Sequence, residues 1–341
     1  MTRVVGQHIT IIGAGATGTL FASILAKNGH HPILWGRRLE HIQALAEKRE
    51  NIAYLPGVAI PPQVRFTADD ATAFDAGELI ICAIPTQFIR ATLQRLAAHI
   101  PAGVPMISVA KGIENGALLR PTEIITEICG QRRIAALAGP AIAGEIAAGL
   151  PTTLVAATTD PALAQWTQQL LSTSYLRIYT NDDVIGVELG GATKNIIAVA
   201  AGILDGMRAG INAKASLLTR GLVEISRLGA AMGAQPRTFS GLAGLGDLAT
   251  TCFSPGSRNR SFGQWIGQGL SHQEALAKMS GVVEGIATTR SVVALARHGH
   301  VDMPITQCLH AVLFEGKSPA AGIAELMSRR PRDERSATDI H

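Results

Sequence analysis

Short apolar runs alternate with amphipathic segments through the first half of the chain. The apolar runs that we expect to be strands cover residues 8–12, 32–35, 78–84, 105–110, 133–138, 152–157 and 175–179. Helical patterns lie between them, for example over residues 86–98 and 161–171. Strands that alternate with helical patterns predict a mostly parallel sheet.

The strand pattern ends after about residue 182. The later segments, such as residues 213–232 and 273–279, carry the 3.6-residue periodicity of helices, interrupted by Gly and Pro. A chain of 341 residues also exceeds the size at which a single hydrophobic core stops growing. We therefore predict two domains, an α/β domain over residues 1–182 and an all-helical domain over residues 183–341.

The composition fits a closely packed α/β protein. Hydrophobic residues make up 47% of the chain, aromatic residues only 4%, and glycine is abundant with 36 residues. The net charge is +4, but the basic residues are scattered and lack the interleaved aromatic residues of single-strand nucleic-acid binders. We therefore expect small anionic ligands rather than nucleic acid as partners.

The spacing of the cysteines and the hydropathy of the chain indicate the cellular compartment of the protein. The four cysteines lie far apart without a Cys-x-x-Cys pair, so we expect free thiols in a reducing environment and no metal site. The first apolar run is brief and enters a glycine-rich stretch, and no later run reaches 18 uninterrupted apolar residues. These patterns favour a cytoplasmic protein that is not inserted in a membrane.

The first strand leads into a glycine-rich turn. Gly13, Gly15 and Gly18 match G-x-G-x-x-G between a predicted strand and a predicted helix. The first glycine permits a tight turn, the second lets backbone approach a pyrophosphate, and the third lets helix and strand pack closely. The context predicts a Rossmann-type, doubly wound dinucleotide-binding domain; a purely structural turn is the alternative.

The second strand ends in two arginines. An NAD-preferring site would place Asp or Glu about twenty residues after the glycine turn, and the chain has Arg37 and Arg38 at this point. Two guanidinium groups would attract a 2′-phosphate, so we predict that NADP(H) is preferred and that NAD(H) is accepted less well. The alternative is a solvated helix start.

Lys194 interrupts a long small-residue apolar run that otherwise predicts a buried helix. The next residues, through Leu204, contain no other ionisable group. A buried ammonium usually shifts its pKa or finds a partner, which makes Lys194 a candidate acid/base. A lysine whose ammonium reaches the solvent is the alternative.

Three further segments offer polar groups for a ligand. Lys111 and Gly139 follow predicted strands, and ligands of parallel sheets bind beyond the strands' carboxyl ends. In the helical half, Asp247 follows two glycines, and a polar cluster with two arginines begins at Ser257. The cluster suits a phosphate, because arginine offers a planar fork to its oxygens. Asp247 and Ser257 could instead be N-caps of helices.

Taken in order, these segments resemble the bacterial NAD(P)-dependent glycerol-3-phosphate dehydrogenase family over nearly the whole chain. The matching motifs are GAGATG at 13–18, LWG at 34–36, AKG at 110–112, GP at 139–140, VELGGATKN at 187–195, GLGDL at 244–248, SRN at 257–259, VVEG at 282–285 and MPIT at 303–306.

The resemblance implies reversible reduction of dihydroxyacetone phosphate to sn-glycerol 3-phosphate, which feeds glycerophospholipid synthesis. It implies that Lys194 is the proton donor and acceptor and that Asp247 orients it or balances its charge. The implied substrate neighbours are Lys111, Gly139, Ala141, Lys194, Asp247, Ser257, Arg258 and Asn259. The implied cofactor neighbours are Gly13, Gly15, Ala16, Thr17, Gly18, Arg37, Arg38, Lys111, Ala143, Arg258, Val282 and Glu284. We also expect a homodimer.

The chain departs from the family pattern at three of these positions. Ala16 and Thr17 stand where the family usually has Ser followed by an aromatic residue, which removes a hydroxyl and a flat surface near the cofactor. Ala141 stands where the family usually has Ser or Thr. One lost neutral hydrogen bond is worth about 0.5–1.5 kcal/mol, so these changes should weaken binding without abolishing it.

Two other functions fit part of the pattern. A ketopantoate reductase-like enzyme shares the two-domain architecture and a similar glycine turn, but its substrate carries a carboxylate instead of a phosphate. A catalytically inactive NADP-binding regulator is the second alternative. The segments around Lys194 and Ser257 favour the phosphate substrate, and the presence of Lys194 and Asp247 favours an active enzyme.

Overall fold

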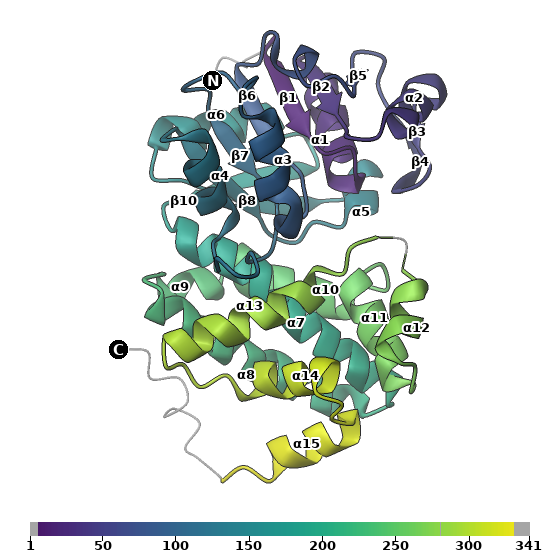
Figure 1. The fold of residues 1–341 in the computed structure, drawn as a ribbon, viewed down its shortest axis with the longest axis vertical. Coiled ribbons are helices and arrows are strands. Elements are labelled where there is room, and N and C mark those ends of the chain that lie inside the picture. Colours follow the sequence, from purple (N-terminus) through teal and green to yellow (C-terminus); the bar gives the residue numbers. More distant parts are fainter. Residues whose placement is uncertain (1–5, 280, 331–341) are drawn as a thin grey trace. The chain divides into compact units, whose positions relative to one another are not determined.

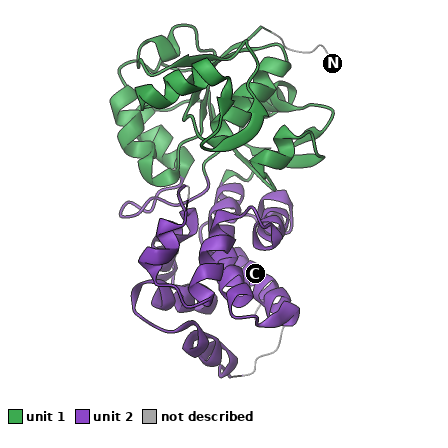
Figure 2. Cartoon of the chain, turned by 90° about the vertical axis from the view of Figure 1, so that its right-hand side faces the viewer, with its two compact units in different colours: residues 1–110, 121–184 green, residues 111–120, 185–341 purple. Residues whose placement is uncertain are grey.

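The computed structural model describes residues 6–279 and 281–330. The chain forms two compact units, drawn in green and purple in Figure 2. The first comprises Met1–Ala110 and Pro121–Val184, and the second comprises Lys111–Arg120 and Ile185–His341. The sequence predicted one boundary, between residues 182 and 183. The structure differs at residues 111–120, which lie inside the first half of the chain but group with the second unit.

The first unit is built on an eight-stranded sheet with the order β10-β9-β8-β7-β6-β1-β2-β5. All neighbouring strands are parallel except β8 and β9, which pair antiparallel. The strands are β1 (His8–Ile12), β2 (His31–Trp35), β5 (Arg65–Thr67), β6 (Leu79–Cys82), β7 (Met106–Ser108), β8 (Ile134–Ala138), β9 (Thr152–Ala157) and β10 (Leu176–Asn181). The predicted doubly wound α/β fold is confirmed.

Helices cover this sheet. Every residue of β6 and β7 is buried, which requires packing on both faces of the strands. Helix α1 (Ala16–Lys27) packs against α5 (Ala143–Ala147) and α6 (Pro161–Leu171), while α3 (Ile89–Leu96) packs against α4 (Pro121–Cys129) (Figure 1). Strand β1 lies between β2 and β6, where the strand order reverses, and such switch points are where open sheets of this kind bind ligands.

Three short strands were not expected from the sequence. β3 (Glu50–Asn51) and β4 (Leu55–Ala59) form a separate antiparallel pair, and β5 is the edge strand beside β2. β4 contains Pro and Gly and is mostly exposed, so it lacks the apolar run of a buried strand. Helix α2 (Leu39–Lys48) connects β2 to this pair.

The second unit is helical, and its described residues contain no strand. Its helices are α7 (Val184–Gly206), α8 (Gly210–Ala231), α9 (Pro236–Phe239), α10 (Asp247–Phe253), α11 (Arg258–Gly267), α12 (His272–Ala277), α13 (Glu284–His298), α14 (Pro304–Phe314) and α15 (Pro319–Met327), with a π-helical turn η3 (Leu242–Gly246) before α10.

Helix α7 is long and apolar enough to cross a membrane by length and composition. However, 83% of the apolar 18-residue stretch within this helix is buried inside the protein. The apolar residues of α7 instead belong to the hydrophobic core of the second unit, together with residues of α8, α11 and α13. Helix α7 is therefore the central core helix of this unit.

Candidate active site

The glycine turn between β1 and α1 is compact at two positions and open at one. Gly13 has φ +116°, and a Cβ on it would lie 2.6 Å from the carbonyl oxygen of Ala83, which follows β6. A Cβ on Gly18 would lie 1.9 Å from the carbonyl oxygen of Gly13. A Cβ on Gly15 would meet nothing within 4 Å. The first and third glycines are thus required by packing, and the second leaves open space at the start of α1.

This arrangement fits a dinucleotide. The open face at Gly15 lies at the N-terminus of α1, where backbone N–H groups favour an anion, and Gly15 caps that helix without a side chain. Ala16 is half-buried and Thr17 is exposed on the first turn. The structure therefore offers backbone, rather than large side chains, for contact with a pyrophosphate.

Arg37 and Arg38 lie close to the turn because Gly36 packs against it. A Cβ on Gly36 would come within 3.0 Å of the Ala14 side chain, so the end of β2 touches the turn directly. Both arginines are exposed, and Arg38 donates a hydrogen bond of 3.0 Å to the hydroxyl of Tyr54. Residues 36–38, which connect β2 to α2, contain two arginines and no carboxylate, and Glu40 follows in the first turn of α2. The two arginines suit a 2′-phosphate.

Two side chains that the sequence did not single out hold the turn in place. His41 Nε2 lies 3.0 Å from the carbonyl oxygen of Ala14, and Asn51 Nδ2 donates to the same oxygen at 3.2 Å. Asn51 also donates to Thr19 Oγ1 at 2.8 Å. Their sequence neighbourhoods, a helix and a two-residue strand, carry no motif, so only the fold identifies them.

Three predicted residues of the first unit lie on the connection from β8 to α5. Gly139 has φ +123°, and a Cβ on it would lie 3.2 Å from Leu154 Cα of β9. Ala141 is exposed, whereas Ala143 is half-buried at the first position of α5. Gly139 is therefore required by the strand packing, and Ala141 leaves a small exposed surface where a hydroxyl was expected.

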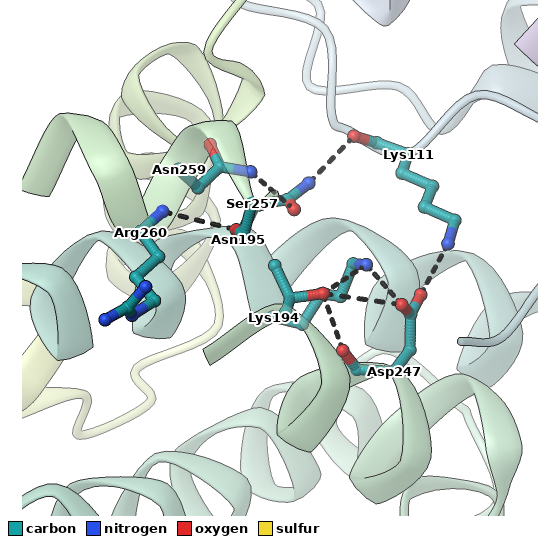
Figure 3. A network of polar contacts seen from close by, with 8 residues as sticks. Lys111, Lys194, Asn195, Asp247, Ser257, Asn259 and Arg260 are labelled. Atoms are coloured by element: carbon teal, nitrogen blue, oxygen red, sulfur yellow. Dashed lines mark hydrogen bonds and ion pairs between the residues drawn. The ribbon is translucent and has the colours of Figure 1, made fainter. Parts of the chain in front are cut away.

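The catalytic candidates meet in the second unit. Lys194 on α7 is 6% exposed and Asp247 at the start of α10 is 1% exposed. The Lys194 ammonium donates to Asp247 Oδ1 and, at 2.7 Å, to Thr251 Oγ1. The Lys111 ammonium donates to the other carboxylate oxygen, Oδ2, at 2.6 Å (Figure 3). One buried carboxylate thus holds two ammonium groups.

Close backbone packing brings Lys194 and Asp247 together. A Cβ on Gly190, one turn before Lys194, would lie 2.6 Å from the carbonyl oxygen of Ala243 in η3. A Cβ on Gly244 would lie 1.9 Å from the carbonyl oxygen of Phe239. Gly190 thus lets η3 approach α7, and Gly244 lets η3 fold closely onto the end of α9; Asp247 follows η3 directly.

Burial changes the acidity of Lys194. Removal from water lowers its pKa to about 7, although the Asp247 carboxylate opposes this effect and the Lys111 ammonium adds to it. A lysine with a pKa in this range can both donate and accept a proton near neutral pH. The alternative of a lysine that reaches the solvent is wrong.

A chain of amide groups links three helices to the segment that carries Lys111. Asn195 Nδ2 donates to the Lys111 carbonyl oxygen at 3.3 Å, and Asn259 Nδ2 donates to Asn195 Oδ1 at 2.9 Å. Asn259 Oδ1 in turn accepts from the Gly285 backbone N–H at 2.9 Å. Residue 111, α7, α11 and α13 are therefore held in one network, part of which Figure 3 shows.

The predicted polar cluster lies at the start of α11, beside the start of α13. Ser257 caps α11 by accepting from the Arg260 backbone N–H at 3.3 Å. Arg258 is exposed, and its guanidinium lies near Gly281, where an added Cβ would be 2.8 Å from Nη1. Val282 is exposed and Glu284 begins α13.

The structure decides between the alternatives for Asp247 and Ser257. Asp247 is not an N-cap: Gly246 is the N-cap of α10, and the carboxylate binds lysines instead. Ser257 is the N-cap of α11, as the alternative for this residue predicted. Arg260 pairs with Asp205 at 2.6 Å, which leaves Arg258 as the exposed arginine of the cluster.

Sequence reasoning missed Thr251 and Asn195. Thr251 lies one turn after Asp247 on α10, so its spacing could have placed it on the same helix face. Asn195 follows Lys194 directly, yet its amide faces the Lys111 backbone. The i, i+4 spacing from Asp247 was the one available signal for Thr251, and the local sequence carried none for the contact that Asn195 makes.

The described residues include free cysteines and no cluster of metal-ligating side chains. Between residues 6 and 330, with residue 280 left out, no group of three or more His, Cys, Asp or Glu side chains could hold a metal ion. The four cysteines are free, with Cys82 and Cys252 buried and Cys129 and Cys308 half-buried. Burial raises the pKa of the Cys82 and Cys252 thiols to about 12, which keeps them protonated.

Comparison with known proteins identifies the family. Residues 8–164 match the profile described as the NAD-dependent glycerol-3-phosphate dehydrogenase N-terminus, and residues 183–324 match the corresponding C-terminus. The chain belongs to the NAD-dependent glycerol-3-phosphate dehydrogenase family. A glycerol-3-phosphate dehydrogenase [NAD(P)+] of Salinibacter ruber is 46% identical over 329 residues, which is 96% of each chain.

Solved structures agree with membership of the glycerol-3-phosphate dehydrogenase family. The crystal structure of glycerol-3-phosphate dehydrogenase from Coxiella burnetii has a TM-score of 0.92 at 35% identity, covering 95% of this chain and 99% of that one. A ketopantoate reductase from Ralstonia eutropha has a TM-score of 0.60 at 17% identity and covers 90% of this chain and 97% of that one, a similarity of fold alone. The family match therefore favours a glycerol-3-phosphate dehydrogenase over a ketopantoate reductase-like enzyme.

Proposed function

We propose that this member of the family is an NAD(P)-dependent oxidoreductase that interconverts dihydroxyacetone phosphate and sn-glycerol 3-phosphate. The observation that carries the proposal is the buried Lys194 ammonium, held by Asp247 and Thr251, with its pKa lowered to about 7. The supporting evidence is the match of both halves of the chain to the family and the fit of the glycine turn to a dinucleotide.

The chain's own residues would carry the proton. A bound nicotinamide cofactor supplies or accepts the hydride at the carbon atom of the substrate. In the reductive direction Lys194 donates a proton to the carbonyl oxygen, and in the oxidative direction its neutral amine accepts the hydroxyl proton. Asp247 holds the Nζ atom in place, and Thr251 accepts a second hydrogen bond from it, so the remaining N–H can point at the substrate.

Cations account for recognition of the phosphate. Lys111 is the more exposed of the two lysines on Asp247, with 20% of its side chain accessible, and Arg258 is exposed at the start of α11. With Lys194 protonated, the two lysines and Asp247 carry a net charge of about +1. This charge favours a dianionic substrate over a neutral one.

The direct test compares substrates and cofactors. Initial rates of NADPH and NADH oxidation should be measured with dihydroxyacetone phosphate and, separately, with ketopantoate. Turnover with the phosphate substrate alone supports the proposal. Turnover with ketopantoate alone would establish the carboxylate-specific alternative, and bound cofactor without turnover on either substrate would establish the inactive regulator.

The rate should depend on pH in opposite ways for the two directions. Reduction requires protonated Lys194, so kcat/KM for dihydroxyacetone phosphate should fall as the pH rises through about 7. Oxidation of glycerol 3-phosphate requires the neutral amine and should rise over the same interval. Profiles of kcat/KM from pH 5 to pH 10 in both directions measure this, and two profiles with the same slope would contradict the role of Lys194.

The preference for NADP(H) is part of the same proposal, based on Arg37 and Arg38. Replacing both with alanine should raise the KM for NADPH about 10- to 100-fold and leave the KM for NADH nearly unchanged, because only the 2′-phosphate loses charge-assisted hydrogen bonds. The control is Arg177→Ala, which removes an exposed arginine of β10, the strand at the far edge of the sheet. Equal effects on both cofactors would show that the arginines do not read the 2′-phosphate.

Three wider expectations belong to this proposal. We infer a homodimer that acts in the cytoplasm and supplies sn-glycerol 3-phosphate for glycerophospholipid synthesis. Sedimentation analysis of the purified protein tests the dimer. Fractionation of cells that produce the tagged protein tests the compartment.

A further inference from the structure

Residues 111–120, called the strap below, belong to the helical unit although they lie between β7 and α4 in the sequence. Figure 2 shows them in the colour of that unit. Lys111, whose ammonium binds Asp247, is the first residue of the strap. The position of Lys111 therefore depends on what attaches the strap to the helices.

Apart from the Asn195 amide, which binds the Lys111 carbonyl oxygen, two attachments hold the strap, and the first is Ile113 together with Ser291 of α13. Ile113 is fully buried in the hydrophobic core of the second unit. The Ser291 hydroxyl, which is 1% exposed, lies 3.4 Å from the Ala287 carbonyl oxygen of its own helix. It makes two shorter contacts with the strap, at 2.5 Å to Asn115 Oδ1 and at 2.9 Å to the Ile113 carbonyl oxygen, and its single proton serves these acceptors. Both contacts lie within a few residues of Lys111 along the strap.

The second attachment is an ion pair at the other end of the strap. Arg120 Nη1 lies 2.6 Å from Glu188 Oε2 on α7, and the two side chains are 11% and 2% exposed. Glu188 lies on the same helix as Lys194. The last residue of the strap is thus fixed to the helix that carries the proposed proton donor.

Hydrogen bonds within the strap join the two attachments. The Glu114 N–H donates to the Leu119 carbonyl oxygen at 2.9 Å, and the Leu118 N–H donates to the Glu114 carbonyl oxygen at 3.1 Å. Gly116 and Leu118, with φ +86° and +60°, turn the chain back on itself. The strap is therefore a closed loop rather than an extended tether.

We infer that Ser291 and the Arg120–Glu188 pair are positioning residues, which act through the strap to hold the Lys111 ammonium against Asp247. This inference rests on the proposed function, because it assigns a catalytic consequence to the position of Lys111. Ser291 contacts the strap at residue 113 and Glu188 contacts it at residue 120, so both contacts are at least two residues away from Lys111.

Displacement of Lys111 has a specific consequence for Lys194. Among the residues that the structure describes, the ionisable groups that face Lys194 are Asp247, Lys111 and the buried Cys252 thiol, which stays protonated. The Lys111 ammonium lowers the pKa of Lys194, so moving it away should raise that pKa. A variant that merely destabilises the unit would not produce this shift.

The experiment compares Ser291→Ala with Thr289→Val in the full-length enzyme. Thr289 is a fully buried neighbour on α13 whose hydroxyl donates only within its own helix, to the Gly285 carbonyl oxygen. Ser291→Ala should lower kcat/KM for dihydroxyacetone phosphate about three- to tenfold, as expected for one lost hydrogen bond, and move the decline of the reductive profile to higher pH. Thr289→Val should leave the profile unchanged.

A double-mutant cycle decides whether the effect passes through Lys111. In a Lys111→Met background, Ser291→Ala should cause no further loss, because the ammonium that it positions is gone. The same loss in both backgrounds would overturn the inference, as would wild-type kinetics of Ser291→Ala.

Hydrogen exchange gives a readout that does not depend on turnover. Amides of residues 114 and 118 should exchange faster in Ser291→Ala than in Thr289→Val and the wild type. Unchanged exchange would overturn the inference even if activity fell. If the wild type did not reduce dihydroxyacetone phosphate at all, the proposed function would fail. Hydrogen exchange of the strap amides, together with the pH dependence of the reaction of Lys194 with an amine-modifying reagent, would still show whether Ser291 fixes the strap and Lys111.

Discussion

Replacing Lys194 with alanine should lower kcat about a thousandfold or more while the cofactor still binds, because a positioned acid/base contributes about 10²- to 10⁴-fold. The buried ammonium is the group that donates to both Asp247 and Thr251. Steady-state kinetics in both directions give kcat, and quenching of protein fluorescence by NADPH gives cofactor affinity. A kcat close to that of the wild type would contradict the acid/base role.

Two further substitutions separate proton transfer from charge and from folding. Lys194→Arg keeps a positive charge but cannot release a proton near neutral pH, so it should be nearly as inactive as the alanine variant. Lys214→Met removes another buried lysine of the same unit, which pairs with Asp205 at 2.8 Å. It should lower the melting temperature but keep kcat within about fivefold, because this lysine lies outside the site.

Asp247→Asn should lower kcat/KM for dihydroxyacetone phosphate about 100- to 1000-fold at pH 8. The carboxylate raises the pKa of Lys194, whereas burial and Lys111 lower it. Without the carboxylate, the pKa should fall below about 7, so less of the protonated donor remains. Part of the lost activity should return as the pH is lowered to 5.5.

The control for Asp247 is a second buried carboxylate. Glu224 on α8 is 2% exposed and accepts hydrogen bonds from the Ile305 and Thr306 backbone N–H groups at the start of α14. Glu224→Gln should change stability without moving the pH profile of kcat/KM. If Asp247→Asn lost activity equally at every pH, the carboxylate would not act through the acidity of Lys194.

The features that could be predicted from the sequence are those whose role follows from neighbouring residues in the chain. Lys194 was recognised because a charge in an apolar run requires a partner, and the glycine turn because its spacing follows from helix and strand geometry. The alternation of apolar runs with helical patterns predicted the doubly wound sheet. In each case the physical cause lies within a few residues of the pattern.

The remaining features depend on contacts between distant segments. β5 has only three residues at the sheet edge, and β9 reverses direction without a change in its apolar pattern. Thr251 and Asn195 were missed because their importance comes from Lys194 and residue 111, not from their neighbours. The grouping of residues 111–120 with the helical unit depends on Ile113, Ser291 and Glu188, which no sequence period connects.

The small size of Gly190 affects the pKa of Lys194. A methyl group there would meet the backbone of Ala243 and push η3, and with it Asp247, away from α7. The Lys194 ammonium would then lose part of the attraction that opposes its burial, and it would release its proton more readily. A change from glycine to alanine, which adds no charge and no polar group, would therefore alter the pH at which the enzyme works.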